Sequence, residues 1–377
     1  MALSLSPVTA HPCNEHPLHW TNTPGGLKRA EYFWREHQKY LADCGYMLRP
    51  RYSKNWQPSW LGTKTDPWQC EDGKSTFVGL VCSSLQVLPL KQVKKSNNPT
   101  EQDIIRFFSE EPLASDPHSH SVPLYEVLQS PIDADVIFLV MPYLMRIYMV
   151  KFTTVGEVLE CLRQLFQGLQ FIHSNLVGHC DLQILNVMMD PTPLFSDMPH
   201  PAYPKKSYDF KKKVTGYTRT ERPTKYYIID FGLSRKFSPG DAFIAPTSFG
   251  GDRSVPEYKD PSGLSNPFPI DVYSFGNLIR EDFLEKSSSV DFLKPLVGEM
   301  MRVKPDERIT IHEAVDLFNG LLASLSERKL RSRYVYRKEF FIARIFRACR
   351  HVVRTAKYLR HGVPALPTPP PPLPPKP

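Results

Sequence analysis

The stretch GHCDLQILNVMMD, residues 178–190, places a histidine, an acid and an amide at short, fixed intervals. Asp181 lies two positions after His179, and Asn186 lies five positions after Asp181, with Cys180 between the first two. Further along, YYIIDFG (residues 226–232) reads as a short strand that ends in a second acid, Asp230. Each piece alone has a structural explanation, such as a helix cap for Asp181. The interpretation therefore depends on what accompanies these pieces in the rest of the chain.

Other polar residues follow a fixed order around this stretch. Lys91 in a strand and Glu101 in the next helix precede it, and Pro256-Glu257, Asp271 and Arg308 follow it. With HCDLQILN, DFG, VPE and VLPLK at the signature positions, this order resembles the eukaryotic protein kinase fold over roughly residues 73–325. The resemblance implies an α+β, two-lobed protein kinase-like fold, with a small β-rich N-lobe that contains one helix and a larger, mainly helical C-lobe.

The hydrophobic pattern agrees with two such lobes. Short β-rich runs such as STFVGLV, LQVLPLKQV and DVIFLVM are interrupted by one helix-like piece, PTEQDIIRFFSEE. After Met145 the apolar residues recur at helical intervals, first in a helix whose start has Thr154 and Glu157 at capping-box spacing. Residues 191–224 form a Pro- and Lys-rich insertion without periodicity, which predicts a surface loop.

The resemblance implies ATP and Mg²⁺ as cofactors and a role for each signature residue. Phosphoryl transfer relies on positioning and on neutralising charge. Asp181 would accept the proton of the attacking hydroxyl, and Asn186 and Asp230 would hold magnesium, which prefers hard oxygen ligands. Lys91 would hold the ATP phosphates and be oriented by Glu101, although Lys94, Lys95, Asp103 and Glu110 lie close enough in sequence to be alternatives.

Two further groups of residues belong to this resemblance. The segment FLVMPYL corresponds to the crossing between the lobes, where backbone groups of Met141, Pro142, Tyr143 and Leu144 would contact adenine. The remaining residues would have structural roles. His179, Phe231 and Gly232 would pack the catalytic loops, and Asp271 would be the helix acid that binds the loop backbone. Glu257 and Arg308 would form a buried ion pair under the substrate-side segment.

The sequence also departs from the kinase pattern. The glycine-rich phosphate cover is missing, since EDGKSTFVGLV has only Gly73 and Gly79. Cys180 stands where an Arg usually precedes the catalytic Asp, which argues against activation by loop phosphorylation. Gln183, assigned to the catalytic group, replaces a Lys that reaches the γ-phosphate in many kinases. The open alternatives are an active kinase for protein hydroxyls (Ser/Thr by family resemblance), a pseudokinase that acts as a binding module, and a small-molecule phosphotransferase.

A narrower resemblance extends beyond the signatures. FWREHQKYLADCGYMLRPRY, SEEPLASDPHSHSVPLYEVLQ and YTRTERPTKYYIIDFGLSR are similar to segments of kinase-like proteins from mushroom-forming fungi. The predicted organisation is an aromatic-rich N-terminal extension at residues 1–72, either packed or only partly ordered, a kinase-like domain at 73–325, and a tail at 326–377.

Composition constrains the environment. Seven scattered cysteines without a CxxC pair argue against a disulfide framework or a structural zinc site. The start of the chain lacks a signal-peptide pattern. The most apolar stretch of the whole chain, DVIFLVMPYLMRIYMVKF, is interrupted by Pro142 and Arg146, too early for a membrane span. We expect an intracellular soluble protein of the cytoplasm or nucleus.

The tail carries the basic excess, with 13 Lys or Arg and one acid, Glu339, from Arg328 onward. Residues 339–360 predict a basic amphipathic helix with Phe341, Ile345, Val352 and Tyr358 on an apolar stripe. It would bind an anionic membrane or an acidic partner, or else dock on the mildly acidic body. No module for specific nucleic-acid binding is present. The polyproline end, residues 364–377, would be a ligand for a proline-binding module or an inert spacer.

Overall fold

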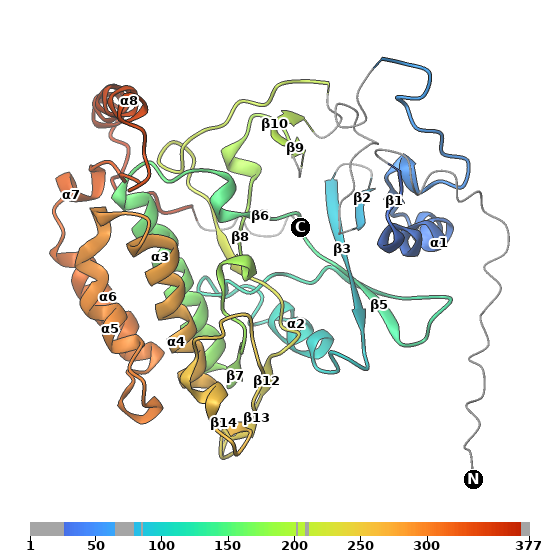
Figure 1. The fold of residues 1–377 in the computed structure, drawn as a ribbon, viewed down its shortest axis with the longest axis horizontal. Helices are drawn as coiled ribbons and strands as arrows, with labels where there is room; N and C mark the ends of the chain where they lie inside the picture. The colour runs from blue at the N-terminus through green and yellow to red at the C-terminus, as the bar shows by residue number, and fades with distance from the viewer. Residues whose placement is uncertain (1–25, 65–78, 84–85, 201–202, 208–210, 371–377) are drawn as a thin grey trace, which may run out of the picture. The chain divides into compact units, whose positions relative to one another are not determined.

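The computed structural model describes residues 26–64, 79–83, 86–200, 203–207 and 211–370 (Figure 1). The chain divides into two compact units, Met1–Gln86 and Val87–Pro377. Within the described residues, every helix is too short or too polar to cross a lipid bilayer. Cys44, Cys161, Cys180 and Cys349 are free thiols.

The first unit is built around one helix. It contains α1 (Arg29–Asp43), β1 (Met47–Leu48), a 3₁₀ turn (Pro50–Tyr52) and β2 (Gly79–Ser83), which pairs antiparallel with β1. Trp34 and Leu41 of α1 are buried. Glu31 is buried as well, and its carboxylate accepts hydrogen bonds from Arg51 Nη2 and Tyr52 OH, each at 3.1 Å. Burial and the Glu31 carboxylate raise the pKa of Tyr52 to about 12.

The second unit begins with an antiparallel sheet and one helix. Strand β5 (Val136–Val140) is buried along its whole length and lies between β3 (Gln86–Lys94) and β4 (Glu126–Gln129). The helix α2 (Glu101–Ser109) buries Ile104, Ile105 and Phe108. This part corresponds to the predicted β-rich lobe with a single helix.

Helices dominate the rest of this unit: α3 (Val155–Ser174), α4 (Pro267–Ile279), α5 (Lys294–Met300), α6 (Ile311–Ser324), α7 (Glu327–Arg331) and α8 (Phe341–Arg360). The N-cap of α3 is the predicted one, since the Thr154 side chain accepts a 3.1 Å hydrogen bond from the backbone N–H of Glu157. The Phe166 ring of α3 lies 4.6 Å from Phe275 of α4 and 4.7 Å from Phe318 of α6, centroid to centroid. The core of the larger lobe therefore surrounds α3.

Short strands and turns carry the loops between these helices. Strands β11 (Tyr226–Ile228), β8 (Val187–Met189) and β6 (Met145–Arg146) form one small sheet, and β7 (Val177–Gly178) pairs with β12 (Arg235–Lys236). The other pairs are β9 (Pro199–His200) with β10 (Tyr203–Ser207), and β13 (Ala245–Pro246) with β14 (Leu264–Ser265). Short 3₁₀ turns lie at 147–149, 184–186, 192–194, 256–259, 288–293 and 305–307, and a π turn at 280–284.

The prediction of a surface loop for residues 191–224 is wrong for its last part, because residues 218–220 are buried. Arg219 donates hydrogen bonds to the carbonyls of Ile147 (2.7 Å) and Val150 (3.0 Å), and its guanidinium lies 4.0 Å above the Phe152 ring. A buried Arg needs such partners for its donors, and it finds them on the segment before α3. The insertion is therefore anchored to the helical lobe at this end.

The C-terminal segment packs on the start of α3. Tyr334 is buried in the main hydrophobic core, and its backbone N–H donates to Thr153 O at 3.0 Å. Ala365 and Pro367 are buried, and Thr368 donates a 3.2 Å hydrogen bond to Glu160 of α3. Two residues of the predicted polyproline ligand, Ala365 and Pro367, are thus covered, whereas Pro364 and Thr368 are exposed and residues 371–377 lie outside the described part of the chain.

Candidate active site

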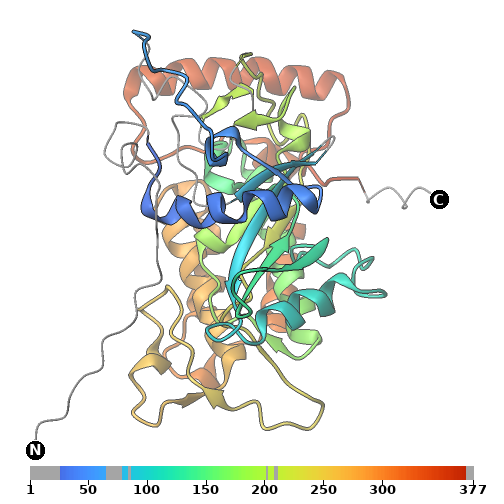
Figure 2. The same cartoon turned by 90° about the vertical axis from the view of Figure 1, so that its right-hand side faces the viewer.

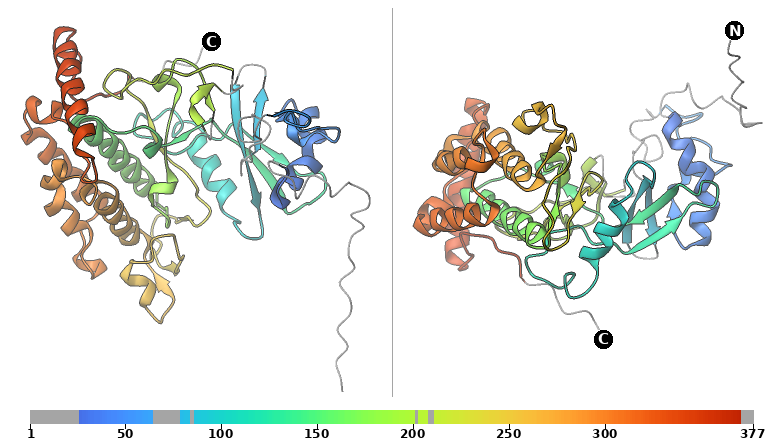
Figure 3. Two further views of the ribbon diagram at one scale, coloured as in Figure 1. Left: turned by 45° about the horizontal axis from the view of Figure 1, so that its top comes forward. Right: turned by 90° about the horizontal axis from the view of Figure 1, so that it is seen from below.

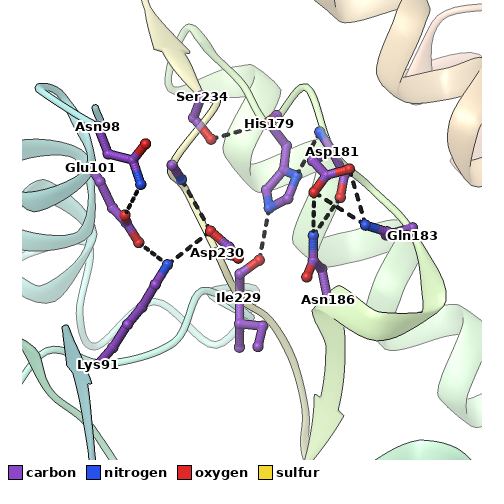
Figure 4. Close-up of polar contacts among 11 residues, drawn as sticks. Lys91, Asn98, Glu101, His179, Asp181, Gln183, Asn186, Ile229, Asp230 and Ser234 are labelled. Atoms are coloured by element: carbon purple, nitrogen blue, oxygen red, sulfur yellow. Dashed lines mark hydrogen bonds and ion pairs between the residues drawn. The ribbon is translucent and has the colours of Figure 1, made fainter. Parts of the chain in front are cut away.

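The lysine of β3 meets two carboxylates (Figure 4). Lys91 Nζ forms an ion pair with Glu101, the first residue of α2, and lies 2.9 Å from Asp230 Oδ1. Asn98 Nδ2 donates to the second Glu101 oxygen at 3.1 Å. Of the alternatives, Lys95 instead contacts Gln129, and Asp103 and Glu110 are exposed. The structure thus brings together Lys91, Glu101 and Asp230.

This ion-pair cluster is partly removed from water. The Glu101 side chain is completely buried, whereas 29% of Lys91 and 43% of Asp230 are exposed. Burial alone would lower the pKa of Lys91, but the carboxylates of Glu101 and Asp230 outweigh it and raise this pKa. Burial would likewise raise the pKa of Asp230, but Lys91 and the Gly232 N–H hold it below its usual value. Both groups are therefore held in their charged forms.

The loop between β7 and β8 orients Asp181 through its own side chains. Asn186 Nδ2 donates to the backbone O and to Oδ2 of Asp181, both at 2.8 Å. Gln183 Nε2 lies 3.3 Å from each Asp181 carboxylate oxygen. The five-residue spacing has a local cause, because the 3₁₀ turn at Ile184–Asn186 brings the amide back toward Asp181.

A pair of glycines from the segment after DFG reaches the same carboxylate. The backbone N–H of Gly251 donates to Asp181 Oδ1 at 2.6 Å. A Cβ on Gly251 would lie within 2.6 Å of three Gln183 side-chain atoms, and one on Gly250 would lie 2.6 Å from Cys180 O. This glycine pair was not among the site residues predicted from the sequence. The double glycine in SFGGD, between DFG and VPE, was the signal that could have indicated it.

Asp271 of α4 fixes the backbone at the start of the loop between β7 and β8. Its carboxylate accepts hydrogen bonds from the backbone N–H groups of His179 and Cys180, each at 2.7 Å, and contacts His173 Nε2 at 2.9 Å. Cys180 has φ +66° and Asp230 has φ +70°. Left-handed backbone in residues other than glycine costs on the order of 1–3 kcal/mol and persists only where surrounding contacts impose it. Asp271 supplies such contacts at Cys180.

His179 and Phe231 link the loops. His179 Nε2 contacts Ile229 O at 3.1 Å, and Asp181 N donates to His179 Nδ1 at 3.3 Å, so the partners favour a proton on Nε2. The buried Phe231 ring lies 5.1 Å from the His179 ring and 5.6 Å from Phe108 of α2. Asp230 is therefore positioned between α2 and the loop that carries Asp181, as Figure 4 shows.

The turn at Pro256–Lys259 is held by a buried ion pair. Arg308 contacts Glu257 through both terminal nitrogens, at 2.7 and 3.3 Å. Arg308 also lies 5.0 Å above the Tyr273 ring. Two parallel contacts between a guanidinium and a carboxylate fix geometry as well as charge.

The family model for the protein kinase domain matches residues 72–287, more than half of the chain. The chain belongs to the protein kinase domain family. The predicted protein kinase-like fold is thereby confirmed. Membership implies phosphoryl transfer from ATP in general, whereas the narrower resemblance to fungal proteins stays a prediction.

Two departures from the usual kinase pattern concern Cys180 and the glycine-poor segment before β2. Burial, followed by the nearby Asp271 carboxylate, raises the pKa of the Cys180 thiol well above its usual value. Cys180 is therefore a neutral packing residue and offers no cation to a phosphate on the kinase's activation segment. The glycine-poor segment that includes Gly73 lies mostly outside the described residues.

The segment between the kinase lobes follows β5. Met141 donates its backbone N–H to Pro89 O at 3.2 Å, and residues 141–144 are half-buried. Burial raises the pKa of Tyr143. The backbone N–H groups of Tyr143 and Leu144 form no hydrogen bond with another described residue. These N–H groups could therefore donate hydrogen bonds to ring atoms of a ligand. That the ligand is adenine stays a prediction.

The donors around Asp230 fit magnesium. No group of three or more His, Cys, Asp or Glu side chains that could hold a metal occurs among the described residues. Magnesium needs fewer protein ligands, because it is usually bound by one or two carboxylates together with phosphates and water. Asn186 uses its amide N–H₂ on Asp181, which leaves its oxygen as an acceptor, and the partly exposed Asp230 supplies the carboxylate.

Proposed function

We propose that this protein transfers the γ-phosphoryl group of ATP to a Ser or Thr hydroxyl of a protein substrate. The observation that carries the proposal is the position of Lys91 between Glu101 and Asp230, which is 139 residues away in sequence. A structural lysine would be satisfied by one carboxylate at lower desolvation cost. A cation between two acids, next to a polar loop, suits a site that receives a highly charged ligand.

Each residue then has a chemical task. Lys91 would contact the phosphates while Glu101 holds its ammonium in place. Asn186 and Asp230 would hold magnesium, which supplies charge neutralisation on the phosphates when bound. Asp181 would accept the hydroxyl proton. Its two short contacts come from Asn186 and Gly251, whereas Gln183 lies 3.3 Å from each carboxylate oxygen and would give up one of these positions to the hydroxyl. Glu257 and Arg308 would support the segment that the substrate contacts.

A pseudokinase is the second candidate, and a specific observation favours it. Gly251 N lies 2.6 Å from Asp181 Oδ1, so the segment after DFG occupies one side of the carboxylate that a hydroxyl would approach. Gln183 offers no cation for the γ-phosphate. In this alternative the fold would bind nucleotide or a protein partner without turnover.

The test compares purified full-length protein with its Asp181→Asn variant for magnesium-dependent ATP turnover. The matched control is Asp316→Asn, the same change at an exposed position of α6. We expect Asp181→Asn to lose turnover by about 10²-fold or more and Asp316→Asn to retain it. Arrays of degenerate peptides centred on Ser, Thr or Tyr would then test the hydroxyl preference. Equal, near-zero turnover by all three proteins, with a thermal shift by MgATP still present, would establish the pseudokinase instead.

A further inference from the structure

Helix α8 presents a broad apolar face to solvent. Phe341, Ile342, Ile345, Phe346, Val352, Val353 and Leu359 each expose between 50% and 74% of their surface. At 100° per residue they occupy one arc together with Ala348, Cys349 and Ala356, and Arg360 in the last turn falls within this arc. Contiguous apolar patches of this kind are rare on monomeric soluble proteins and mark interaction sites.

The opposite face of α8 holds the helix on the larger lobe. Tyr358 is buried, and its hydroxyl forms a 2.9 Å hydrogen bond with Thr218 Oγ1. Arg347 Nη1 forms an ion pair with Glu339 at 2.6 Å. The sequence-based placement of Tyr358 on the apolar stripe is therefore wrong, because at 100° per residue Tyr358 lies on the opposite side of the helix from the apolar arc. The exposed arc therefore belongs to a helix that is held on the larger lobe by its other face. Figure 2 shows that α8 is continuous along its length.

Cations border the exposed arc, and α8 contains no acid. Its basic residues are Arg344, Arg347, Arg350, Arg354, Lys357 and Arg360. On the helical wheel, Arg350 and Lys357 flank one edge of the apolar arc and Arg344 flanks the other. This combination of an apolar face with basic edges is typical of helices that lie in the plane of an anionic membrane surface.

Charge decides between the occupants of this face. Two copies of α8 that paired through their apolar arcs would bring together the cations at the edges of each arc (Arg344, Arg350 and Lys357), and such like-charge contacts oppose association. An anionic bilayer complements both the arc and its edges. We propose that α8 binds the surface of an anionic lipid membrane, with its apolar arc at the boundary between headgroups and acyl chains.

The position of α8 suits this role. Both views in Figure 3 place it at the end of the second unit away from the β3–β5–β4 sheet. Lys91 on β3 would therefore remain away from the lipid when α8 is bound. The proposal concerns recruitment and does not depend on phosphoryl transfer.

The test is co-flotation of the full-length protein with vesicles of phosphatidylcholine alone or mixed with phosphatidylserine. Ile345→Ser/Phe346→Ser removes apolar surface and keeps every charge, and Ile132→Ser/Ile244→Ser is its control at two other exposed positions. Arg350→Gln/Lys357→Gln removes two flanking cations, and its control is Arg302→Gln/Lys304→Gln on another exposed surface. Melting temperatures verify that each variant folds.

We expect binding to the phosphatidylserine vesicles that weakens with salt. Both α8 variants should lower the partition coefficient roughly tenfold or more, and both controls should bind like the wild type. Undiminished binding by Ile345→Ser/Phe346→Ser would overturn the proposal. Absence of wild-type binding to both kinds of vesicle would overturn it as well. In that case, light scattering that shows a dimer for the wild type and a monomer for Ile345→Ser/Phe346→Ser would assign the face to a second copy of the chain.

Discussion

The backbone N–H of Gly251 donates a 2.6 Å hydrogen bond to Asp181 Oδ1 across 70 residues of sequence. The neighbouring Gly250 N–H donates to Tyr258 OH at 2.9 Å. These two contacts hold the glycine pair between the candidate catalytic base and the turn at Pro256–Lys259. The segment after DFG is thus coupled to the catalytic loop through backbone, whereas Cys180 provides no cation for a phosphate-dependent coupling.

Gly251→Ala should lower ATP turnover by roughly tenfold to a hundredfold, because its Cβ would lie 2.4 Å from Gln183 Nε2 and must displace either Gln183 or the hydrogen bond to Asp181. The measurement is steady-state turnover together with the melting temperature. Gly298→Ala on α5 is the matched control, since nothing lies within 4 Å of its new Cβ. Equal turnover in both variants would show that Gly251 does not position Asp181.

Lys91→Met should lower the free energy of unfolding by about 3 kcal/mol, because it leaves the fully buried Glu101 carboxylate without its cation. In the double variant Lys91→Met/Glu101→Gln the buried charge is absent, so part of that loss should be recovered. Urea unfolding of the two single variants, the double variant and the wild type gives the coupling energy. Additive effects of the two substitutions would contradict a direct interaction.

The acid dependence of this cluster has a definite sign. The folded-state pKa of Asp230 is lowered, so its contribution to stability is present above the usual Asp pKa of about 4 and is lost as the pH falls through the lower folded value. The folded-state pKa of Lys91 is raised, so its contribution is lost only as the pH rises above about 10. The stability gap between wild type and Lys91→Met should therefore be largest between these limits and shrink in acid. A gap that does not change with pH would exclude this linkage.

The catalytic loop was predictable because its geometry is local. A 3₁₀ turn within six residues brings Asn186 to Asp181, so the spacing alone carries the contact. Lys91 and Glu101 were chosen among neighbours through the family resemblance. Strand register and the start of α2 explain physically why these two residues meet.

Contacts that depend on tertiary packing could not be read in the same way. The pairing of Gly251 with Asp181 depends on how the segment after DFG returns to the loop. The burial of Arg219 depends on carbonyls of a segment about 70 residues earlier. The hydrogen bond between Tyr358 of α8 and Thr218 likewise depends on how α8 packs against the insertion, although strict helical spacing already separates Tyr358 from the apolar residues.

His120 should make the protein acid-labile. Burial, the largest cause, lowers the pKa of His120 to about 3, although its Nδ1 contacts Tyr226 O. The unfolded chain, with a His pKa of about 6.5, then binds a proton that the folded state does not, so stability falls as the pH decreases from about 6.5 toward 3, by at most about 1.4 kcal/mol per pH unit. His120→Gln should reduce this slope in urea unfolding between these limits. His118→Gln, at an exposed position, is the control, and an unchanged slope in His120→Gln would refute the assignment.

Gly156→Ala should detach the segment after α8 from α3. A Cβ at Gly156 would lie 2.1 Å from the carbonyl oxygen of Ala365, and backbone cannot yield as a flexible side chain does. Overpacking of this kind costs about 1–3 kcal/mol. Helix propensity alone would instead stabilise the variant by up to about 1 kcal/mol, so the two causes predict opposite signs. Urea unfolding measures the sign, and hydrogen exchange of peptides covering residues 361–370 should increase. Gly320→Ala on α6, with open space around its Cβ, should leave that exchange unchanged. A stabilised Gly156→Ala variant with protected residues 361–370 would mean that this segment does not cross α3 at Gly156.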